Sequence, residues 1–233
     1  MAGSSAPSPV DFRVAPEIAA TVRLGLVRGE PVSVGEAGPA LDAEMAALAA
    51  ELVERHAGRS PSEIEGLAPG RDLYRAFGID PTRTRPSSEA LLRRVLLGKP
   101  LPRVLNAVDV CNLCSLRFLL PIGLYDREAI RGPVELRRGR PNESFRGIRK
   151  EDIHLEGRPT VADADGPFGN PSSDSLRTSV TPATRSLFLV IFAPARFDRS
   201  RLEADVAFAR GAIERHLAPP GKLAATSGSL YPP

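Results

Sequence analysis

Polar residues that could do chemistry gather in the central part of the sequence, among apolar neighbours. Asn106, Asp109 and Asn112 are spaced three residues apart. In a helix this spacing brings side chains close together on one flank. Such a row could line a small-molecule pocket, or it could cap loops and tie the helix to neighbouring backbone. The sequence leaves both interpretations open.

Among the carboxylates in the second half of the chain, we single out three as candidates. They are Glu143, Asp163 and Asp165. A carboxylate held near a reacting ester can act as a general base. Carboxylates at strand ends also cap loops by accepting backbone hydrogen bonds. We therefore treat these three residues as candidates for either role.

A second polar group precedes the apolar segment 186–192. It consists of Asp174, Arg177, Thr178 and Thr181. Together, a carboxylate, a guanidinium and two hydroxyls could recognise an amino group and a phosphate or carboxyl group. The alternative is a polar loop stabilised by the turn-forming hydrogen bonds of Thr and Ser.

The two cysteines, Cys111 and Cys114, form a Cys-x-x-Cys motif. A structural zinc site needs four ligands, and the sequence offers neither a second cysteine pair nor histidines at ligand spacing. A redox pair would be expected beside a βαβ pattern. We interpret the cysteines as reduced, packed thiols and predict no metal and no cofactor. No phosphate-binding loop of the G-x-x-x-x-G-K-[ST] type occurs, so we expect no synthetase activity from this chain alone.

Charge is unevenly distributed although the net charge is only +3. The segment Glu17–Glu65 has nine acidic residues and four Arg, whereas Arg71–Arg103 and Arg127–Lys150 each have eight basic and three acidic residues. A basic middle region favours a surface that faces a polyanion. The alternative is an ordinary solvated surface in a composition that favours Arg.

Arginine dominates these basic segments, since only three of the 31 basic residues are Lys. Arg can bind phosphate oxygens through two N–H groups and stack on bases. The residues that we expect to contact RNA are Arg93, Arg94, Arg137, Arg138 and Arg140.

The composition is that of a folded protein, with 42% hydrophobic and 25% charged residues in 233. It excludes a wholly disordered or fibrous chain. No apolar run is long enough for a transmembrane helix, and the first residues lack the basic start and apolar core of a secretory signal. We therefore expect a cytoplasmic protein with a single domain over residues 10–218, between disordered tails at 1–9 and 219–233.

Hydrophobic periodicity predicts helices and strands around the candidate residues. The predicted helices are Leu41–Ala57, Ser87–Leu97, Val104–Leu119 and Arg201–Leu217, with a helical turn at Asp72–Phe77. The predicted strands are Thr21–Arg28, Val134–Arg137, Thr160–Ala162 and Ser186–Phe192, with a short alternating segment at Val10–Val14. Strands, helices, strands and a closing helix in this order favour an α+β fold.

Several short tracts in this order resemble a known family. They are Pro86–Arg94, Asn106–Asn112, Leu120–Asp126, Ile130–Gly132 with Val134–Arg137, Asn142–Glu143 and Val161–Pro167. Together they are similar to the B3/B4 domain of the phenylalanyl-tRNA synthetase β subunit, over about Tyr74 to Ala193. The chain looks most like the free-standing proteins built from that domain alone. The resemblance implies a single mixed α+β domain with a pocket between helix and sheet.

In the synthetase, this pocket receives the mischarged 3′ end of tRNA and hydrolyses the wrong aminoacyl ester, chiefly tyrosyl. The family usually has Pro-apolar-His-Ala-Phe-Asp after the third helix, whereas this chain has Gly123 at the histidine position. By resemblance, Gly123 joins the pocket candidates. Tyr125 and Asp126 join them as polar residues that follow the third predicted helix among apolar neighbours. Asp165 and Thr178 are our candidates for the catalytic groups.

Three functions remain open from the sequence. The chain could hydrolyse mischarged aminoacyl-tRNA in trans, because an aminoacyl ester is already activated and needs only a positioned water and oxyanion donors. It could instead be a non-catalytic module that binds RNA or a small amino-acid-like ligand. The third is a structural protein that binds a partner through the acidic helix Leu41–Ala57. The expected partner is the 3′ end of tRNA or aminoacyl-tRNA, and neither DNA nor a membrane is expected.

Overall fold

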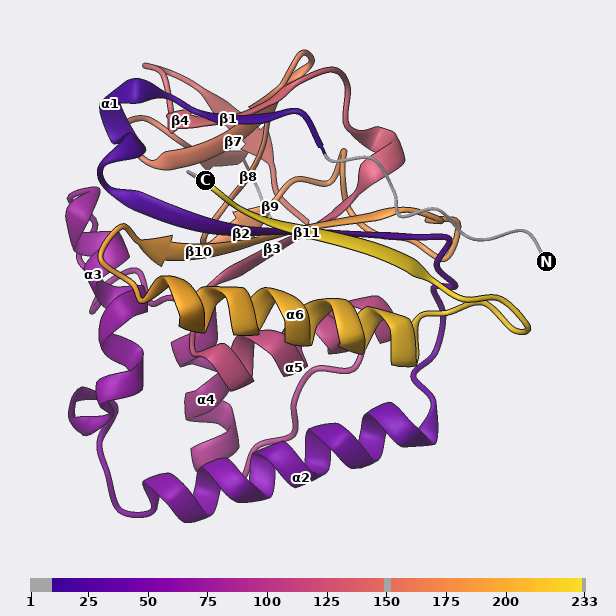
Figure 1. Ribbon diagram of the computed structural model, residues 1–233. Coiled ribbons are helices and arrows are strands. Elements are labelled where there is room, and N and C mark those ends of the chain that lie inside the picture. The colour runs from indigo at the N-terminus through magenta and orange to yellow at the C-terminus, as the bar shows by residue number, and fades with distance from the viewer. Residues whose placement is uncertain (1–9, 149–151, 232–233) are drawn as a thin grey trace.

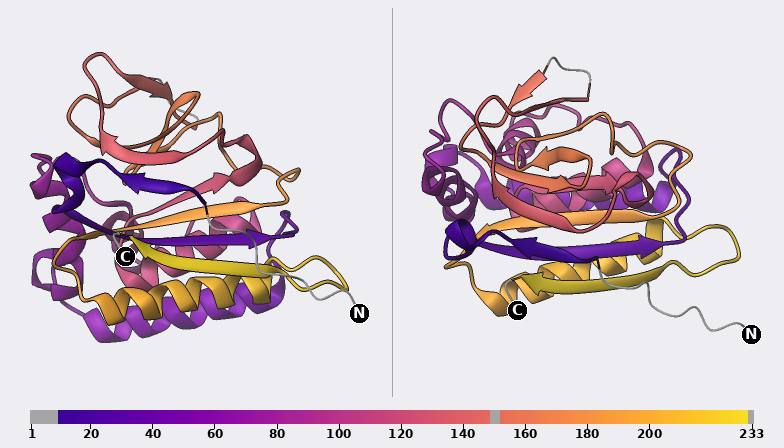
Figure 2. Two further views of the ribbon diagram at one scale, coloured as in Figure 1. Left: turned by 45° about the horizontal axis from the view of Figure 1, so that its top comes forward. Right: turned by 90° about the horizontal axis from the view of Figure 1, so that it is seen from above.

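The computed structural model describes residues 10–148 and 152–231, and its elements form three layers (Figures 1 and 2). A four-stranded sheet lies in the middle, with helices against one face and a five-stranded sheet against the other. The helices are α1 (Pro16–Ala19), α2 (Pro39–His56), α3 (Ala68–Ala76), α4 (Ser87–Leu96), α5 (Asn106–Phe118) and α6 (Arg199–His216). The α+β fold predicted from the sequence is confirmed.

The middle sheet is antiparallel, with strand order β11-β2-β10-β3. Its strands are β2 (Val22–Glu30), β3 (Ile122–Asp126), β10 (Leu187–Pro194) and β11 (Ala225–Tyr231). Every residue of β10 is buried, because helices cover one face of the sheet and the second sheet covers the other. A continuous apolar run is the pattern expected for a strand covered on both faces.

The second sheet has the order β1-β4-β7-β8-β9. Its strands are β1 (Phe12–Val14), β4 (Val134–Arg138), β7 (Pro159–Asp163), β8 (Gly166–Asn170) and β9 (Ser173–Asp174). A separate hairpin pairs β5 (Ser144–Arg146) with β6 (Asp152–His154). Aromatic side chains fill the space between the two large sheets, and Tyr125 meets Phe168 edge to face at a centroid distance of 4.9 Å.

Helices α5 and α6 pack closely under the middle sheet (Figure 1). Glycines on β2 permit the close approach of α6, because a Cβ at Gly25 would lie 2.6 Å from Cγ2 of Val206. A Cβ at Gly29 would lie 2.7 Å from Cγ2 of Ile213. The small residues in β2 therefore set the distance between the sheet and α6.

The predicted tail at 219–233 needs correction, because Ala225–Tyr231 forms β11 and pairs with β2. Its Ser, Thr and Gly residues show no alternating apolar pattern, so pairing with a neighbour decides its conformation. The predicted tail at 1–9 lies outside the described residues. Within the described ranges, the structure contains no helix that is both long and apolar enough to cross a membrane.

Candidate functional site

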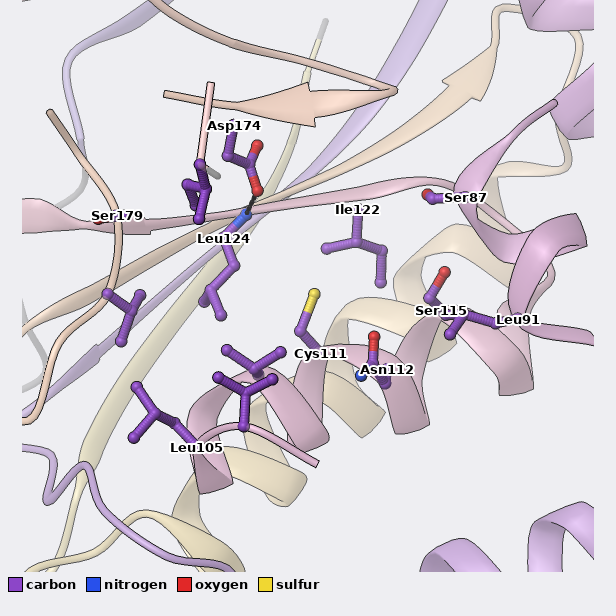
Figure 3. A pocket seen from close by; sticks show the side chains of 14 residues that line it. Ser87, Leu91, Leu105, Cys111, Asn112, Ser115, Ile122, Leu124, Asp174 and Ser179 are labelled. Atoms are coloured by element: carbon purple, nitrogen blue, oxygen red, sulfur yellow. Dashed lines mark hydrogen bonds between the residues drawn. The ribbon is translucent and has the colours of Figure 1, made fainter. Parts of the chain in front are cut away.

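A cavity of about 400 Å³ lies between helix α5 and strand β3 (Figure 3). The start of α4 and the loop 174–180 close its sides. Most of its lining is apolar, and the apolar residues are Leu91, Val104, Leu105, Val108, Ile122, Leu124, Ile148 and Val180. Its volume falls within the range of roughly 300–1,000 Å³ that is typical of small-molecule sites.

A few polar side chains enter this apolar cavity from different elements. They are Ser87 from α4, Cys111, Asn112 and Ser115 from α5, Asp174 from the end of β9, and Ser179 from the loop that follows β9. The hydroxyl of Ser115 donates to the carbonyl oxygen of Leu120 at 2.8 Å. Asp174 is the one charged side chain among the described residues of the lining. Apolar walls with a few convergent polar groups are characteristic of ligand sites.

Asp174 reaches the cavity from the edge of the middle sheet. Strand β3 is the edge strand, and the backbone N–H of Leu124 donates to Oδ2 of Asp174 at 3.4 Å. Two positions further, the N–H of Asp126 donates to the carbonyl oxygen of Thr178 at 2.9 Å. The loop that carries Asp174 is therefore docked along the open edge of β3.

The Cys111 thiol also faces the cavity (Figure 3). Burial raises its pKa well above the usual value, and Cys114 and Asp174 add to this effect. A thiol must lose its proton to act as a nucleophile or metal ligand. Cys111 is therefore a protonated, uncharged part of the wall, and both cysteines are free.

Gly123 does not line the cavity, because Ile122 and Leu124 point towards α5 and position 123 points to the other face of β3. A Cβ at Gly123 would lie 2.1 Å from the hydroxyl oxygen of Tyr125. The Tyr125 side chain therefore occupies the space into which a side chain at position 123 would extend. The resemblance led us to expect Gly123 in the pocket, and the structure places it outside the described lining.

The row on α5 does not form one site. Asn106 bonds backbone instead, since its Oδ1 accepts from Gly35 and its Nδ2 donates to the Ser33 carbonyl oxygen, both at 2.9 Å. Asp109 is buried and pairs with Arg103 at 3.1 Å. Burial raises the pKa of Asp109, while Arg103 opposes this. Of the predicted row, only Asn112 faces the cavity.

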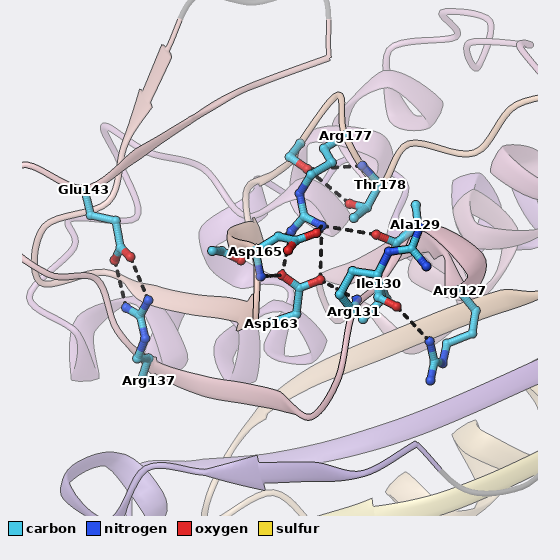
Figure 4. A network of polar contacts seen from close by, with 12 residues as sticks. Arg127, Ala129, Ile130, Arg131, Arg137, Glu143, Asp163, Asp165, Arg177 and Thr178 are labelled. Carbon is cyan, nitrogen blue, oxygen red and sulfur yellow. Dashed lines mark hydrogen bonds and ion pairs between the residues drawn. The ribbon is translucent and has the colours of Figure 1, made fainter.

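Asp163, Asp165 and Arg177 form a network of polar contacts (Figure 4). None of the three belongs to the cavity lining. The Asp163 side chain is inaccessible to solvent and accepts two bonds from the Arg177 guanidinium, at 3.1 and 2.8 Å. Asp165 is exposed and lies 3.8 Å from the same guanidinium. These contacts hold the closing loop against the second sheet.

The predicted threonines have structural contacts. Thr178 is buried, and its hydroxyl lies 3.1 Å from that of Ser175. Thr181 is exposed, and its backbone N–H donates to the Thr184 hydroxyl at 3.0 Å. That hydroxyl donates to Oδ2 of Asp126 at 2.6 Å. None of the predicted residues Asp126, Thr178 and Thr181 belongs to the lining.

Glu143 and Arg137 are bound to each other by two hydrogen bonds of 2.8 and 2.6 Å (Figure 4). Arg137 lowers the pKa of Glu143, and the backbone N–H of Arg140 contributes. Arg138 is exposed and stacks over Phe77. Glu143, Arg137 and Arg138 belong to the second sheet and its loops and are not part of the cavity lining.

The predicted RNA-binding arginines come from two separate layers of the fold. Arg93 and Arg94 lie on α4 in the helical layer and are exposed. Arg137 and Arg138 lie on β4 in the second sheet, on the other side of the middle sheet (Figure 1). The five arginines therefore do not form one patch.

The sequence did not predict several lining residues, namely Ser87, Ile122 and Ser179. It predicted Cys111 as a packed thiol but not as part of a cavity lining. The first residue of a helix and the apolar residues flanking a glycine carry no sequence signal for a cavity. Asp174 and Asn112 were found because they belong to polar groups next to apolar segments. Among residues 10–148 and 152–231, no cluster of three or more potential metal ligands occurs.

Comparison with known proteins identifies the type of domain. A search of curated proteins finds no match. A crystal structure of an N-terminal fragment of the phenylalanyl-tRNA synthetase β subunit from Pyrococcus horikoshii is similar at 13% identity and a TM-score of 0.46; the match covers 98% of this chain and 56% of that chain. This chain thus spans little more than half of that fragment. The B3/4 domain family model matches residues 70–217. The chain therefore belongs to the B3/4 domain family.

Proposed function

We propose that this protein binds the aminoacyl end of an aminoacyl-tRNA in the α5–β3 cavity and hydrolyses its ester in trans. The observation that carries the proposal is the position of Asp174, a single carboxylate in an apolar wall. A carboxylate has about four acceptor positions, so Asp174 can accept from a ligand besides its bond from Leu124. The cytoplasm, where aminoacyl-tRNA is used, is the proposed location.

The chemistry of the lining suits an ester better than a free amino acid. An aminoacyl ester has a positive α-ammonium group but no free carboxylate. The described lining offers Asp174 to the ammonium, and none of its residues is Lys or Arg. The apolar residues around Val108 and Leu124 favour an apolar amino-acid side chain.

Hydrolysis in this cavity requires few groups. Water adds to the ester carbonyl carbon, the bond to the ribose oxygen breaks, and the ribose hydroxyl leaves with a proton. Asn112 offers two amide N–H donors that can stabilise the negative oxygen of the tetrahedral intermediate. Binding the ammonium at Asp174 holds the carbonyl near that amide.

A non-catalytic binding module is the second candidate. The described lining contains no histidine, and the one thiol in it is kept protonated by burial. This cavity therefore has no strong nucleophile, and its binding capacity does not depend on one. Turnover distinguishes the two candidates.

The test is deacylation of a panel of mischarged tRNAs, with release of labelled amino acid followed over time. We expect release of an apolar amino acid above the spontaneous rate. Asp174→Asn should slow this release at least tenfold, because the neutral amide binds the ammonium weakly. Glu203→Gln is the matched control, since it neutralises an exposed carboxylate on α6.

Two further variants examine the catalytic residues expected from the sequence. If Asp165→Ala or Thr178→Ala reduces release more than Asp174→Asn, the reacting groups lie outside the proposed cavity. Retention of tRNA at low salt without release would support the binding module. The absence of both would contradict both candidates.

A further inference from the structure

Tyr125 carries a hydroxyl in an unusual environment. The residue is completely buried, and its hydroxyl has no close hydrogen-bond partner within the described structure. Buried tyrosine hydroxyls usually have a hydrogen-bond partner in the protein, because burial removes their hydrogen bonds to water. A phenylalanine would fill the same ring volume without an unpaired hydroxyl.

Two glycines leave room for this hydroxyl. A Cβ at Gly123 on β3 or at Gly169 on β8 would lie 2.1 Å from the Tyr125 oxygen. The ring is fixed between the sheets by the edge-to-face contact with Phe168 and by Phe188 at a centroid distance of 6.3 Å. The position of the hydroxyl is therefore set by the backbones of two strands.

The same geometry places the hydroxyl beside Asp174. Gly169, which the hydroxyl touches, is the direct partner of Asp174 in the β8–β9 pairing. The carboxylate of Asp174 lies at the β3 edge, next to the backbone of Leu124. After burial, Asp174 is the largest cause of the raised pKa of Tyr125.

A further titratable group near this pair is the Cys111 thiol on α5, which interacts with both Tyr125 and Asp174. Cys111 is uncharged, because burial raises its pKa. The raised pKa values of Tyr125 and Cys111 mean that both groups keep their protons at neutral pH. The protonated hydroxyl of Tyr125 can therefore act as a hydrogen-bond donor to the carboxylate of Asp174.

We propose that Tyr125 is a positioning residue, whose hydroxyl donates to the Asp174 carboxylate and holds it towards the cavity. The role of Tyr125 in ligand binding rests on the proposed function. The contact between its hydroxyl and Asp174 rests on the geometry alone. Hydrogen bonds in ligand-free sites are often long and tighten when the ligand binds. Tyr125 would then orient, from behind the strand, the carboxylate that receives the ammonium.

The test is Tyr125→Phe, which removes only the hydroxyl. The carboxyl carbon of Asp174 is followed by NMR during a pH titration, and binding of phenylalanine amide is measured by calorimetry. This probe has an α-ammonium and no free carboxylate. We expect the pKa of Asp174 to rise by about half a unit in the variant, because the variant lacks a donor to the ionised form. The affinity for the amide should fall several-fold.

Tyr74→Phe is the matched control. Tyr74 is also buried, and its hydroxyl bonds Ser172 at 2.7 Å and the Pro171 carbonyl oxygen at 3.1 Å. This substitution removes a buried hydroxyl that contacts residues 171 and 172, close to Asp174 in sequence, and it leaves Asp174 itself unchanged. We expect Tyr74→Phe to lower stability but to leave the Asp174 titration unchanged.

The outcomes separate this inference from the proposed function. An unchanged Asp174 titration in folded Tyr125→Phe overturns the positioning role, even if the protein deacylates tRNA. A shifted titration in a protein that neither binds the amide nor releases amino acid supports the contact and contradicts the proposed function. A shift of equal size in Tyr74→Phe would also overturn the inference, because it would show a general response of the loop.

Discussion

The guanidinium of Arg177 bonds both carboxylate oxygens of Asp163, at 2.8 and 3.1 Å. The same carboxylate also accepts from the backbone N–H groups of Arg131 at 2.8 Å and Asp165 at 3.0 Å. A buried carboxylate with this many donors is well satisfied. Since Arg177 belongs to the loop that closes the cavity, this pair anchors the loop to the end of β7.

Removing Arg177 should therefore destabilise the fold. Arg177→Ala leaves the Asp163 carboxylate buried without its counter-charge. We expect a destabilisation of about 2 kcal/mol, less than for a fully buried pair because Arg177 is partly exposed and two backbone donors remain. Urea unfolding measures the change. A double variant with Asp163→Asn should recover part of it, whereas additive effects would contradict the coupling.

Gly123→Ala should destabilise the protein through one steric contact. Its Cβ would lie 2.1 Å from the Tyr125 oxygen and 2.6 Å from Cζ, so the ring or the strand has to move. Overpacking of this kind costs about 1–3 kcal/mol. Gly35→Ala is the control for thermal unfolding, because a Cβ there meets no atom of the described part of the chain within 4 Å. Equal stability of the two variants would contradict the assigned packing of Tyr125.

The longest elements could be predicted from the sequence because each contains many residues that follow one hydrophobic pattern. The apolar run of β10 and the helical periodicity of α2, α5 and α6 specify their conformation locally. Strands β3, β8 and β11 could not be predicted, since Gly123, the Gly-Pro-Phe-Gly tract of β8 and the small polar residues of β11 break any alternation. Pairing with neighbouring strands decides their conformation.

The candidate site was predictable only in part, for a geometric reason. Three residues of an α-helix turn by about 300°, so each step along the row drifts by about 60°. Asn106 and Asn112 therefore point in directions about 120° apart, towards the Ser33–Gly35 segment and into the cavity. Which of these directions faces β3 depends on how α5 packs, and the sequence pattern does not contain this information.

The arginines expected to bind RNA should differ in their response to substitution. Arg93 and Arg94 are exposed, so the double change to Ala should leave the fold intact. If they bind tRNA phosphates, the slope of log affinity against log salt should fall by about one for each phosphate that is no longer neutralised. Filter binding over a salt series measures this slope. An unchanged slope would exclude α4 from the RNA interface.

Arg137→Ala is the informative comparison, because this side chain is buried in its bidentate bond to Glu143. Its removal takes away both side-chain hydrogen bonds that Glu143 accepts from Arg137 and should lower stability instead of the salt slope. A folded Arg137→Ala protein with a reduced slope would show that β4 contacts RNA directly.

Asp205 on α6 should make stability depend on pH. Burial raises its pKa from 3.8 to about 6, although Arg201 and Arg117 oppose the shift. One of its carboxylate oxygens, Oδ2, is buried without a hydrogen-bond partner among the residues that the structure describes. The folded state therefore binds the proton more tightly than the unfolded state, whose carboxyl has an ordinary pKa. The resulting stabilisation is complete below about pH 4 and disappears as the pH rises through 6.

Asp205→Asn removes this titration, so the variant should gain stability over the parent protein as the pH rises from 5 to 8. The expected change in the difference is about 1 kcal/mol, because solvent reaches part of the side chain and reduces the full effect. Urea unfolding of both proteins at the two pH values gives the difference. Glu203→Gln, on the same helix but exposed and paired with Arg199, should show no such change. A pH-independent difference between parent and Asp205→Asn would mean that Asp205 stays ionised in the folded protein at pH 5.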